Sequence, residues 1–193
     1  MKIGIDIDNV ISNFDEALLN EYLLYNKKMH NNCEINKNAK NIREGMFNWD
    51  DEEERNFYKN NIERIAINLK AIDGASKYIK KLKEDGHIIY IISGRDNGDY
   101  TDPYKMTKDW LKKYDIVYDK LFLVDACDSH SKTVICLEQS VDLMIDDSKR
   151  MCKDLKEHNI KTFIMDTPYN RNATEVMRVH TWEEIYKLIK CEN

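Results

Sequence analysis

The sequence predicts an α/β fold in which a Rossmann-like parallel sheet carries helices on both faces, with a small helical insertion. From residue 73 onward, short apolar runs alternate with amphipathic helical patterns, as is typical of parallel sheets covered on both faces. Residues 28–73 instead carry helical patterns without a clear strand. We therefore expect residues 1–13 and 73–193 to form one core domain, and residues 14–72 to form a small helical insertion that could act as a lid.

The N-terminal elements follow from apolar spacing and capping residues. Residues 2–7 have the apolar character of a short buried strand. A helix over residues 14–28 is predicted by apolar side chains at helical spacing: Phe14, Leu18, Tyr22 and Tyr25. Residues 31–45 are polar and rich in asparagine, which predicts a loop. Asp50 and Glu53 form a capping box for a second helix, whose acidic first turn suits the helix dipole.

The remaining elements alternate regularly between helix and strand. Helices are expected over residues 74–84, 103–114, 132–139 and 148–158, and strands over residues 87–92, 120–124, 141–145 and 160–165. Asp85-Gly86 closes the first of these helices, and Pro103 opens the second. Thr181 and Glu184 form a capping box for a terminal helix.

Composition excludes several classes of partner. The formal net charge of −5 argues against binding to a nucleic-acid polymer, and no apolar run approaches the length of a membrane span. No signal peptide is visible at the N-terminus. The five cysteines are odd in number and form no C-x-x-C pair, which predicts reduced thiols and a cytoplasmic protein without a zinc site: Cys33, Cys127, Cys136, Cys152 and Cys191.

Two carboxylates, Asp6 and Asp8, follow the first predicted strand with one apolar residue between them. Side chains two residues apart on a strand point to the same side, so these carboxylates can converge. Ligands of open parallel sheets bind at the carboxyl ends of the strands. Converging carboxylates repel each other unless a cation or a shared proton intervenes. The pair therefore indicates a site for a hard metal ion and a phosphate that the ion bridges.

Complementary polar residues follow the other predicted strands. Ser93-Gly94-Arg95 comes after the second strand, Lys132 opens the helix after the third, and Asp146-Asp147 ends the fourth. Phosphoryl transfer to an aspartate needs such a set, because one carboxylate attacks phosphorus while others hold Mg²⁺. The hydroxyl and the ammonium group bind phosphoryl oxygens and offset their charge.

In this order, Asp6-Ile7-Asp8-Asn9-Val10, Ser93, Lys132 and Asp146-Asp147 resemble the four motifs of the haloacid dehalogenase-like superfamily. The resemblance implies a Mg²⁺-dependent phosphatase. The second aspartate, Asp8, is similar to the acid/base of the phosphatase branch. By the same resemblance Asp6 is the nucleophile that forms an aspartyl-phosphate, and Asp8 protonates the leaving oxygen and then activates water.

The resemblance also implies the ligands of the metal and of the phosphate. Asp6 and Asp146 would bind Mg²⁺ through their side chains, and Asp8 through its backbone carbonyl. Because Asp147 adjoins Asp146, we expect its side chain to diverge and to lie in the second coordination shell or to act as a helix cap. The phosphate would be bound by Ser93, Gly94 and Lys132, with Lys132 also orienting the nucleophile.

A narrower resemblance is to the 5'(3')-deoxyribonucleotidase family. It is carried by Ser93-Gly94-Arg95, by residues 132–136 and by the Asp-Thr-Pro-Tyr-Asn-Arg segment at residues 166–171, together with the position of the insertion. It implies a monomeric or homodimeric enzyme that hydrolyses a (deoxy)nucleoside monophosphate. Arg95, Phe47 and Trp49 are candidate substrate-binding residues. Arg95 could instead pair with a loop acid, and the two aromatic residues could instead pack beneath the cap.

Two other functions stay open at this point. The first is hydrolysis of another small phosphorylated metabolite, because the substrate depends on the insertion and on the loop from Ser93 to Pro103. The second is a phospho-accepting receiver-type signalling domain, which uses a similar acidic pocket and a lysine. A receiver carries its adjacent acidic pair first and its phosphoacceptor on a middle strand, whereas this sequence has the D-x-D pair first and the adjacent pair last.

Overall fold

Strand β1 (Lys2–Ile5) lies inside a parallel sheet of six strands in the order β3-β2-β1-β4-β5-β6, within the described residues 1–96 and 98–191 of this computed structural model. The other strands are β2 (Ile88–Ser93), β3 (Lys120–Leu123), β4 (Leu143–Asp146), β5 (Lys161–Met165) and β6 (Met177–Val179). The chain leaves β1 toward β2 and β3 on one side, and returns to β4 on the other. This reversal between β1 and β4 creates the crevice in which open α/β sheets bind ligands.

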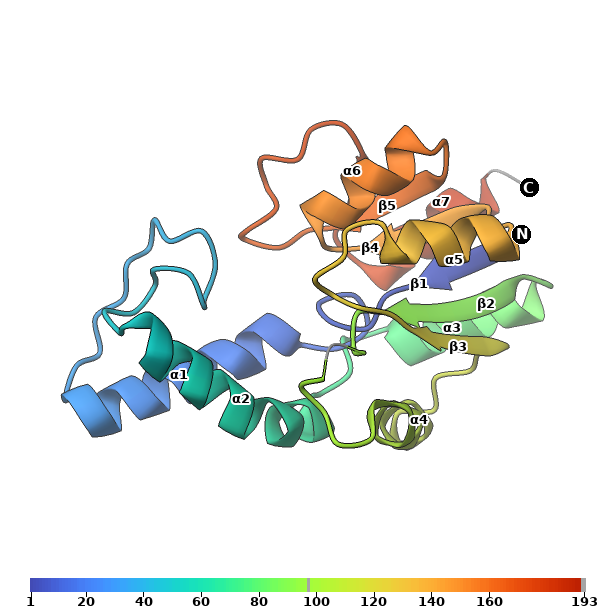
Figure 1. The fold of residues 1–193 in the computed structure, drawn as a ribbon. Coiled ribbons are helices and arrows are strands. Elements are labelled where there is room, and N and C mark those ends of the chain that lie inside the picture. The colour runs from blue at the N-terminus through green and yellow to red at the C-terminus, as the bar shows by residue number, and fades with distance from the viewer. Residues whose placement is uncertain (97, 192–193) are drawn as a thin grey trace.

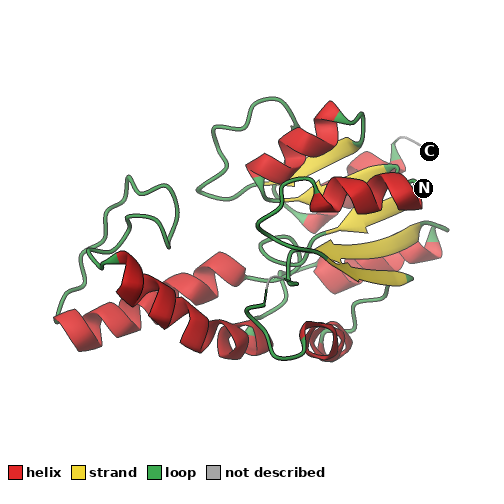
Figure 2. Ribbon diagram, viewed as in Figure 1, coloured by secondary structure: helices red, strands yellow, loops and turns green. Residues whose placement is uncertain are grey.

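Helices cover both faces of the sheet (Figure 2). One face carries α3 (Ala75–Glu84), α4 (Pro103–Lys113) and α7 (Trp182–Lys190), and the other carries α5 (Ser131–Gln139) and α6 (Lys149–Glu157) (Figure 1). Ile3 and Ile5 of β1 are fully buried in the larger core, which the first set of helices covers. The predicted α/β class and the helices on both faces are confirmed.

Gly4 points toward the opposite face, where the packing leaves no room for a side chain. A Cβ atom at Gly4 would lie 2.6 Å from the Met144 sulfur and 3.1 Å from Cδ1 of Ile92. Met144 and Ile92 belong to the smaller core under α5 and α6. Glycine at this position therefore leaves room for the Met144 and Ile92 side chains to pack over β1.

Residues 14–72 extend away from the sheet and from both termini (Figure 1). They contain α1 (Phe14–His30), a long loop, and α2 (Asp51–Asn68). The Asp50 side chain accepts hydrogen bonds from the backbone N–H groups of Glu52 and Glu53, which confirms the predicted cap of α2. An aromatic cluster joins the two helices and the loop: Tyr22, Tyr25, Phe47, Trp49 and Phe57.

The structure departs from the sequence prediction mainly at the edges of elements. Strand β6 was not predicted, because it has three residues and its first, Met177, is half exposed.

All five cysteines lie in the described part of the chain and are free thiols, as expected. Among the described helices, none combines the length and the apolar character that crossing a membrane requires.

Candidate active site

Asp6 and Asp146 lie at the carboxyl ends of the neighbouring strands β1 and β4. Asp6 follows β1 directly, and its backbone N–H donates to the carbonyl of Ile145 on β4 at 3.0 Å. Asp146 is the last residue of β4. Both side chains are almost completely buried. Parallel pairing of β1 and β4 thus brings together two carboxylates that are 140 positions apart in the sequence, as the analysis of strand ends predicted.

Lys132 links these two carboxylates. It lies in the first turn of α5, and its Nζ is 2.9 Å from Oδ1 of Asp6 and 2.6 Å from Oδ2 of Asp146. Burial disfavours the charged form, but the two carboxylates outweigh it and keep the pKa of Lys132 above its usual value. One ammonium group therefore offsets two buried acids, and the site keeps an excess of negative charge.

Asp147 joins the same acidic cluster. One carboxylate oxygen from each of Asp6, Asp146 and Asp147 lies within 4.8 Å of the others. Asp147 thus diverges from Asp146 less than expected, and its place in the second coordination shell stays a prediction. The reason for the smaller divergence is Asn9, whose Nδ2 donates to Oδ2 of Asp147 at 2.9 Å and draws it toward the loop after β1.

The acidic cluster has the properties of a site for a hard divalent cation. Burial and the charges of Asp146 and Asp8 together raise the pKa of Asp6 to about 6, against the opposing effect of Lys132. Burial, together with Asp146 and Asp6, also raises the pKa of Asp147. A cation bound among these oxygens would relieve the repulsion, and an all-oxygen donor set is the one that Mg²⁺ prefers.

Asp8 is held by Arg95 and not by the acidic cluster. Nε of Arg95 donates to Oδ2 of Asp8 at 3.1 Å, and its Nη2 donates to Oδ1 at 2.5 Å. From the sequence we expected Arg95 to bind either a substrate or an acid of its own loop. The structure shows a bidentate pair with Asp8 instead. The arrangement leaves only the backbone carbonyl of Asp8 as a candidate ligand for a cation.

Two buried donors in this region have no partner among the described residues. Oγ of Ser93 and Nη1 of Arg95 are both buried without a hydrogen bond there. A buried donor without a partner costs about 1–3 kcal/mol, so a water molecule, an ion or a ligand that accepts from it would recover that cost. Ser93 ends β2, next to β1, and both donors therefore lie near the carboxyl end of the central strands.

Gly94 packs closely against the loop after β3. A Cβ atom at this position would lie 2.9 Å from Cβ and 3.0 Å from Cα of Ala126. Glycine therefore keeps the Ser93–Arg95 turn close to the loop that leads to Lys132. Its predicted contact with phosphate stays a prediction.

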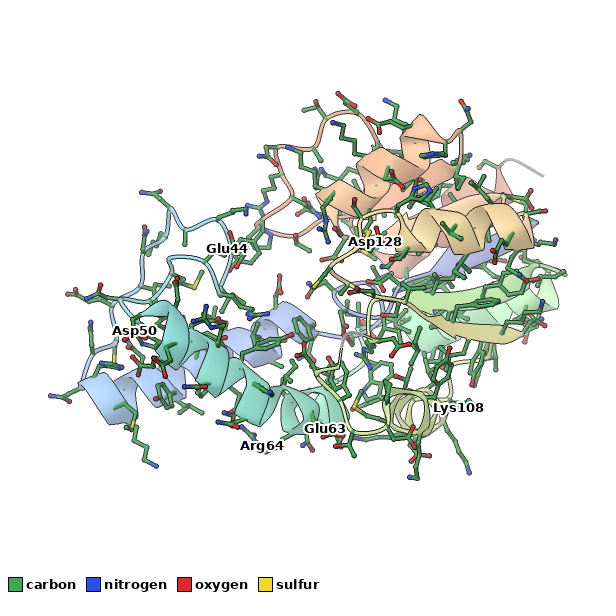
Figure 3. The ribbon with its side chains drawn as sticks, in the orientation of Figure 1. Glu44, Asp50, Glu63, Arg64, Lys108 and Asp128 are labelled. Carbon is green, nitrogen blue, oxygen red and sulfur yellow. The ribbon has the colours of Figure 1, made fainter. Side chains whose placement is uncertain are left out.

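Residues 14–72 border two cavities. One, of about 510 Å³, is lined by residues of α1, the long loop and α2, among them Phe14, Asp15 and Glu44. Glu44 is labelled on the long loop in Figure 3. The other, of about 290 Å³, is lined in part by Phe47 and Trp49. Both aromatic residues also pack in the aromatic cluster, where Trp49 stacks on Tyr22 with 5.0 Å between ring centroids. They thus serve in packing, and their contact with substrate stays a prediction.

Two tyrosines near Asp8, Tyr58 and Tyr100, were not predicted from the sequence. The charge of Asp8, after burial, contributes to the raised pKa values of Tyr100, in the loop after β2, and Tyr58, on α2. Tyr58 also carries the guanidinium of Arg43 at 3.5 Å from its ring centroid. No local pattern marks these residues, since only the fold brings α2 and the loop after β2 to the same carboxylate.

Asn170, within the Pro-Tyr-Asn-Arg turn, binds the backbone of the acidic cluster at Asp147. Its Nδ2 donates to the backbone carbonyls of Asp147 at 2.9 Å and of Met165 at 2.7 Å. Arg178 of β6 in turn donates to Oδ1 of Asn170 at 2.6 Å. The turn that suggested the narrower family resemblance therefore fixes the backbone at Asp147.

Comparisons with known proteins point to one family. A family model described as 5' nucleotidase, deoxy (pyrimidine), cytosolic type C protein matches residues 1–192. A nucleotidase of Clostridium acetobutylicum is 26% identical over 140 residues, which cover 72% of this chain and 69% of that protein. A 5'(3')-deoxyribonucleotidase of Bacillus subtilis is 28% identical over 138 residues, which cover 67% of this chain and 68% of that protein.

Solved structures share the fold. A haloacid dehalogenase-like hydrolase from Streptococcus pneumoniae matches with a TM-score of 0.69 at 13% identity, over 97% of both chains. A protein from Clostridium acetobutylicum described as a predicted phosphatase matches with a TM-score of 0.66 at 15% identity, over 98% of this chain and 97% of that one. At these identities the likeness concerns the fold alone.

Proposed function

The chain belongs to the family of 5' nucleotidase, deoxy (pyrimidine), cytosolic type C proteins, with the haloacid dehalogenase-like fold, and we propose that it hydrolyses (deoxy)nucleoside monophosphates as a 5'(3')-nucleotidase. It is a phosphoric monoester hydrolase by this membership. The observation that best supports the proposal is a pair of buried donors, Ser93 Oγ and Arg95 Nη1, that have no hydrogen-bond partner among the described residues and lie near the Asp6–Lys132–Asp146 cluster. Donors of this kind beside a nucleophilic carboxylate suit a phosphate group.

In the proposed reaction, a carboxylate oxygen of Asp6 attacks phosphorus and the bond from phosphorus to the leaving oxygen breaks. Asp8 gives a proton to that oxygen, so that the nucleoside leaves as an alcohol and Asp6 carries an aspartyl-phosphate. Asp8, now ionised, takes a proton from a water molecule that attacks phosphorus. Inorganic phosphate leaves and Asp6 is regenerated.

We assign Mg²⁺ to the acidic cluster. Asp6, Asp146 and the backbone carbonyl of Asp8 would hold it, and Asp147 lies near enough to bind it directly or through water. When bound, the ion offsets the negative charge of the phosphoryl group. Lys132 contributes from the protein side, because its ammonium lies 2.9 Å from the attacking carboxylate and keeps that group ionised and oriented.

Residues 14–72 act as the cap in this proposal. Tyr58 of α2 and Tyr100 after β2 lie close enough to Asp8 for its charge to help raise their pKa values. Two hydrogen bonds from Thr101 to Glu63 of α2 connect the cap with the core loop. Phe47, Trp49 and the cavity beside Asp15 are further places at which the nucleoside could be selected. We expect a cytoplasmic enzyme that works as a monomer or homodimer on a small phosphorylated substrate.

The order of the motifs and the cap favour this function over a receiver domain, since Tyr58 of the cap would have no counterpart there. Hydrolysis of another small phosphorylated metabolite is the alternative that must be separated by experiment. The test is Mg²⁺-dependent phosphate release from a panel of deoxy- and ribonucleoside monophosphates, sugar phosphates and an aryl phosphate. We expect kcat/KM for the nucleotides to exceed that for the sugar phosphates at least tenfold. Equal values would remove the nucleotidase assignment, and no release from any member would remove the phosphatase assignment.

A further inference from the structure

A second group of metal-ligating side chains lies on the helical face formed by α5 and α6. His130 immediately precedes α5, Asp154 lies on α6, and His158 caps the C-terminus of α6. The side chains are 44%, 20% and 39% exposed, so an ion in solvent can reach them. The loop that leads to His130 carries Asp128, labelled in Figure 3.

The three side chains converge. One ligand atom of each lies within 4.8 Å of the others, and the two imidazole rings are 4.8 Å apart between centroids. An ion with bonds of about 2.1 Å spans at most about 4.2 Å between opposite ligands. Small rotations of the side chains would therefore close the three around one ion without a change in the backbone.

Neighbouring groups already orient the ligands. Oγ1 of Thr133 donates to Oδ2 of Asp154 at 2.5 Å, and Nδ1 of His130 lies 2.8 Å from the same oxygen. Nδ1 of His158 lies 2.8 Å from the backbone carbonyl of Asp154 and 3.9 Å from Oδ1 of its side chain. Both imidazole rings thus direct Nδ1 at Asp154, and because carbonyl and carboxylate oxygens only accept, both nitrogens donate there. An ion bound among these atoms would displace the two protons, as metal binding to histidine requires.

We propose that His130, Asp154 and His158 form a binding site for a borderline divalent metal ion of the Zn²⁺ class. Two imidazoles and one carboxylate suit such ions, whereas Mg²⁺ prefers oxygen ligands only. The site is distinct from the acidic cluster, and it would link the start of α5 to the end of α6. Since α5 carries Lys132, a bound ion would stabilise the helix pair that supports the active site.

The test is zinc binding by equilibrium dialysis in excess Mg²⁺, which occupies the acidic cluster. The variants are His130→Ala and His158→Ala, and the control is His180→Ala, which removes another exposed histidine beside an aspartate. We expect the wild type and the control to bind one zinc equivalent more than the two variants. Zinc at a hundredfold over its Kd should raise the Tm of the wild type by about 5–10 °C and leave that of the variants unchanged.

The proposal would be overturned if the wild type and both variants bound the same number of zinc ions and showed equal Tm shifts. His130 and Asp154 would then form only a hydrogen-bonded pair between the helices. A second measurement does not depend on variants. Substoichiometric Co²⁺ should broaden the ring signals of two histidines selectively in the NMR spectrum of the wild-type protein, and uniform or absent broadening would contradict the site. The nucleotidase proposal is tested separately, by measuring Mg²⁺-dependent phosphate release. We expect His158→Ala to retain this activity, because His158 lies outside the acidic cluster.

Discussion

Arg95 donates hydrogen bonds to both carboxylate oxygens of Asp8, from Nε to Oδ2 at 3.1 Å and from Nη2 to Oδ1 at 2.5 Å. The guanidinium is fully buried, and its third nitrogen, Nη1, has no partner among the described residues. Arg95 can therefore orient the proposed acid/base with one edge and contact a phosphoryl or leaving-group oxygen with Nη1. The planar fork of arginine makes both contacts possible at once.

Replacing Arg95 by lysine should lower kcat by about 10–100-fold, because lysine keeps the charge but loses the bidentate grip on Asp8. The measurement is steady-state phosphate release in Mg²⁺. Arg64→Lys is the matched control, since Arg64 makes a bidentate pair with Glu21 on the surface. Equal activity of Arg95→Lys and the control would contradict the positioning role.

Lys132→Met should lower the free energy of unfolding by about 3–5 kcal/mol, because it leaves the buried carboxylates of Asp6 and Asp146 without a cation. Mg²⁺ should recover part of the loss by supplying positive charge to the same oxygens. Urea unfolding with and without Mg²⁺ measures both effects. Lys153→Met, at an exposed position, should change stability by less than about 0.5 kcal/mol. A similar loss in both variants would count against the buried ion pairs.

Asn9 should control the affinity for Mg²⁺ through Asp147. Its φ of 60° lies in the left-handed region, and its side chain joins Asp147 to the backbone N–H of Asp15. Asn9→Gly keeps that backbone conformation and loses the hydrogen bonds, so the Mg²⁺ concentration for half-maximal activity should rise about 10–100-fold. Asn9→Ala should show the same rise and an added loss of stability from backbone strain.

Asn159 provides the control for this prediction, since it is exposed and has the same φ of 60°. Asn159→Ala should reduce stability and leave the Mg²⁺ dependence of activity unchanged. If Asn9→Gly also leaves the Mg²⁺ dependence unchanged, Asn9 does not position a metal ligand.

The raised pKa of Asp6 predicts the pH dependence of stability in the absence of metal. The folded protein binds this proton with a pKa of about 6, against the ordinary value of 3.8. The stability that Asp6 contributes is therefore greatest below pH 3.8 and is lost as the pH rises to about 6. Mg²⁺ should consequently stabilise the protein more at pH 7 than at pH 5.

Urea midpoints between pH 4.5 and 7.5, for the wild type and Asp6→Asn, isolate this group from the other carboxylates. We expect the wild type to lose stability relative to the variant as the pH rises. A difference that is constant with pH would contradict the raised pKa of Asp6.

Local sequence patterns were enough for most of the fold. Helix caps and buried strands depend on residues that are neighbours in the sequence. The structure confirms the caps at Asp50 and Thr181 and the strands β1, β2 and β4. Asp6, Lys132 and Asp146 meet because parallel strands end at one edge of the sheet, which topology alone predicts. Strand β6 was not predicted, because three residues are too few to show a periodicity that distinguishes a strand from a loop.

The finer geometry of the site could not be predicted, because it depends on side-chain contacts between distant positions. Asn9 turns Asp147 toward the cluster across 138 residues of sequence, and Arg95 binds Asp8 across 87. Each contact needs specific rotamers and a specific loop conformation, including the left-handed backbone at Asn9. No single-sequence pattern distinguishes such a partner from a solvated side chain.

Chemical trapping can show whether Asp6 is the nucleophile of the proposed reaction. Borohydride reduces an aspartyl-phosphate to homoserine, so the enzyme is mixed with a nucleoside monophosphate and Mg²⁺, quenched with borohydride and sequenced by mass spectrometry. We predict homoserine at position 6, only when substrate and Mg²⁺ are both present, and none in Asp6→Asn. Homoserine at another aspartate, or rapid phosphate release by Asp6→Asn, would show that Asp6 is not the nucleophile.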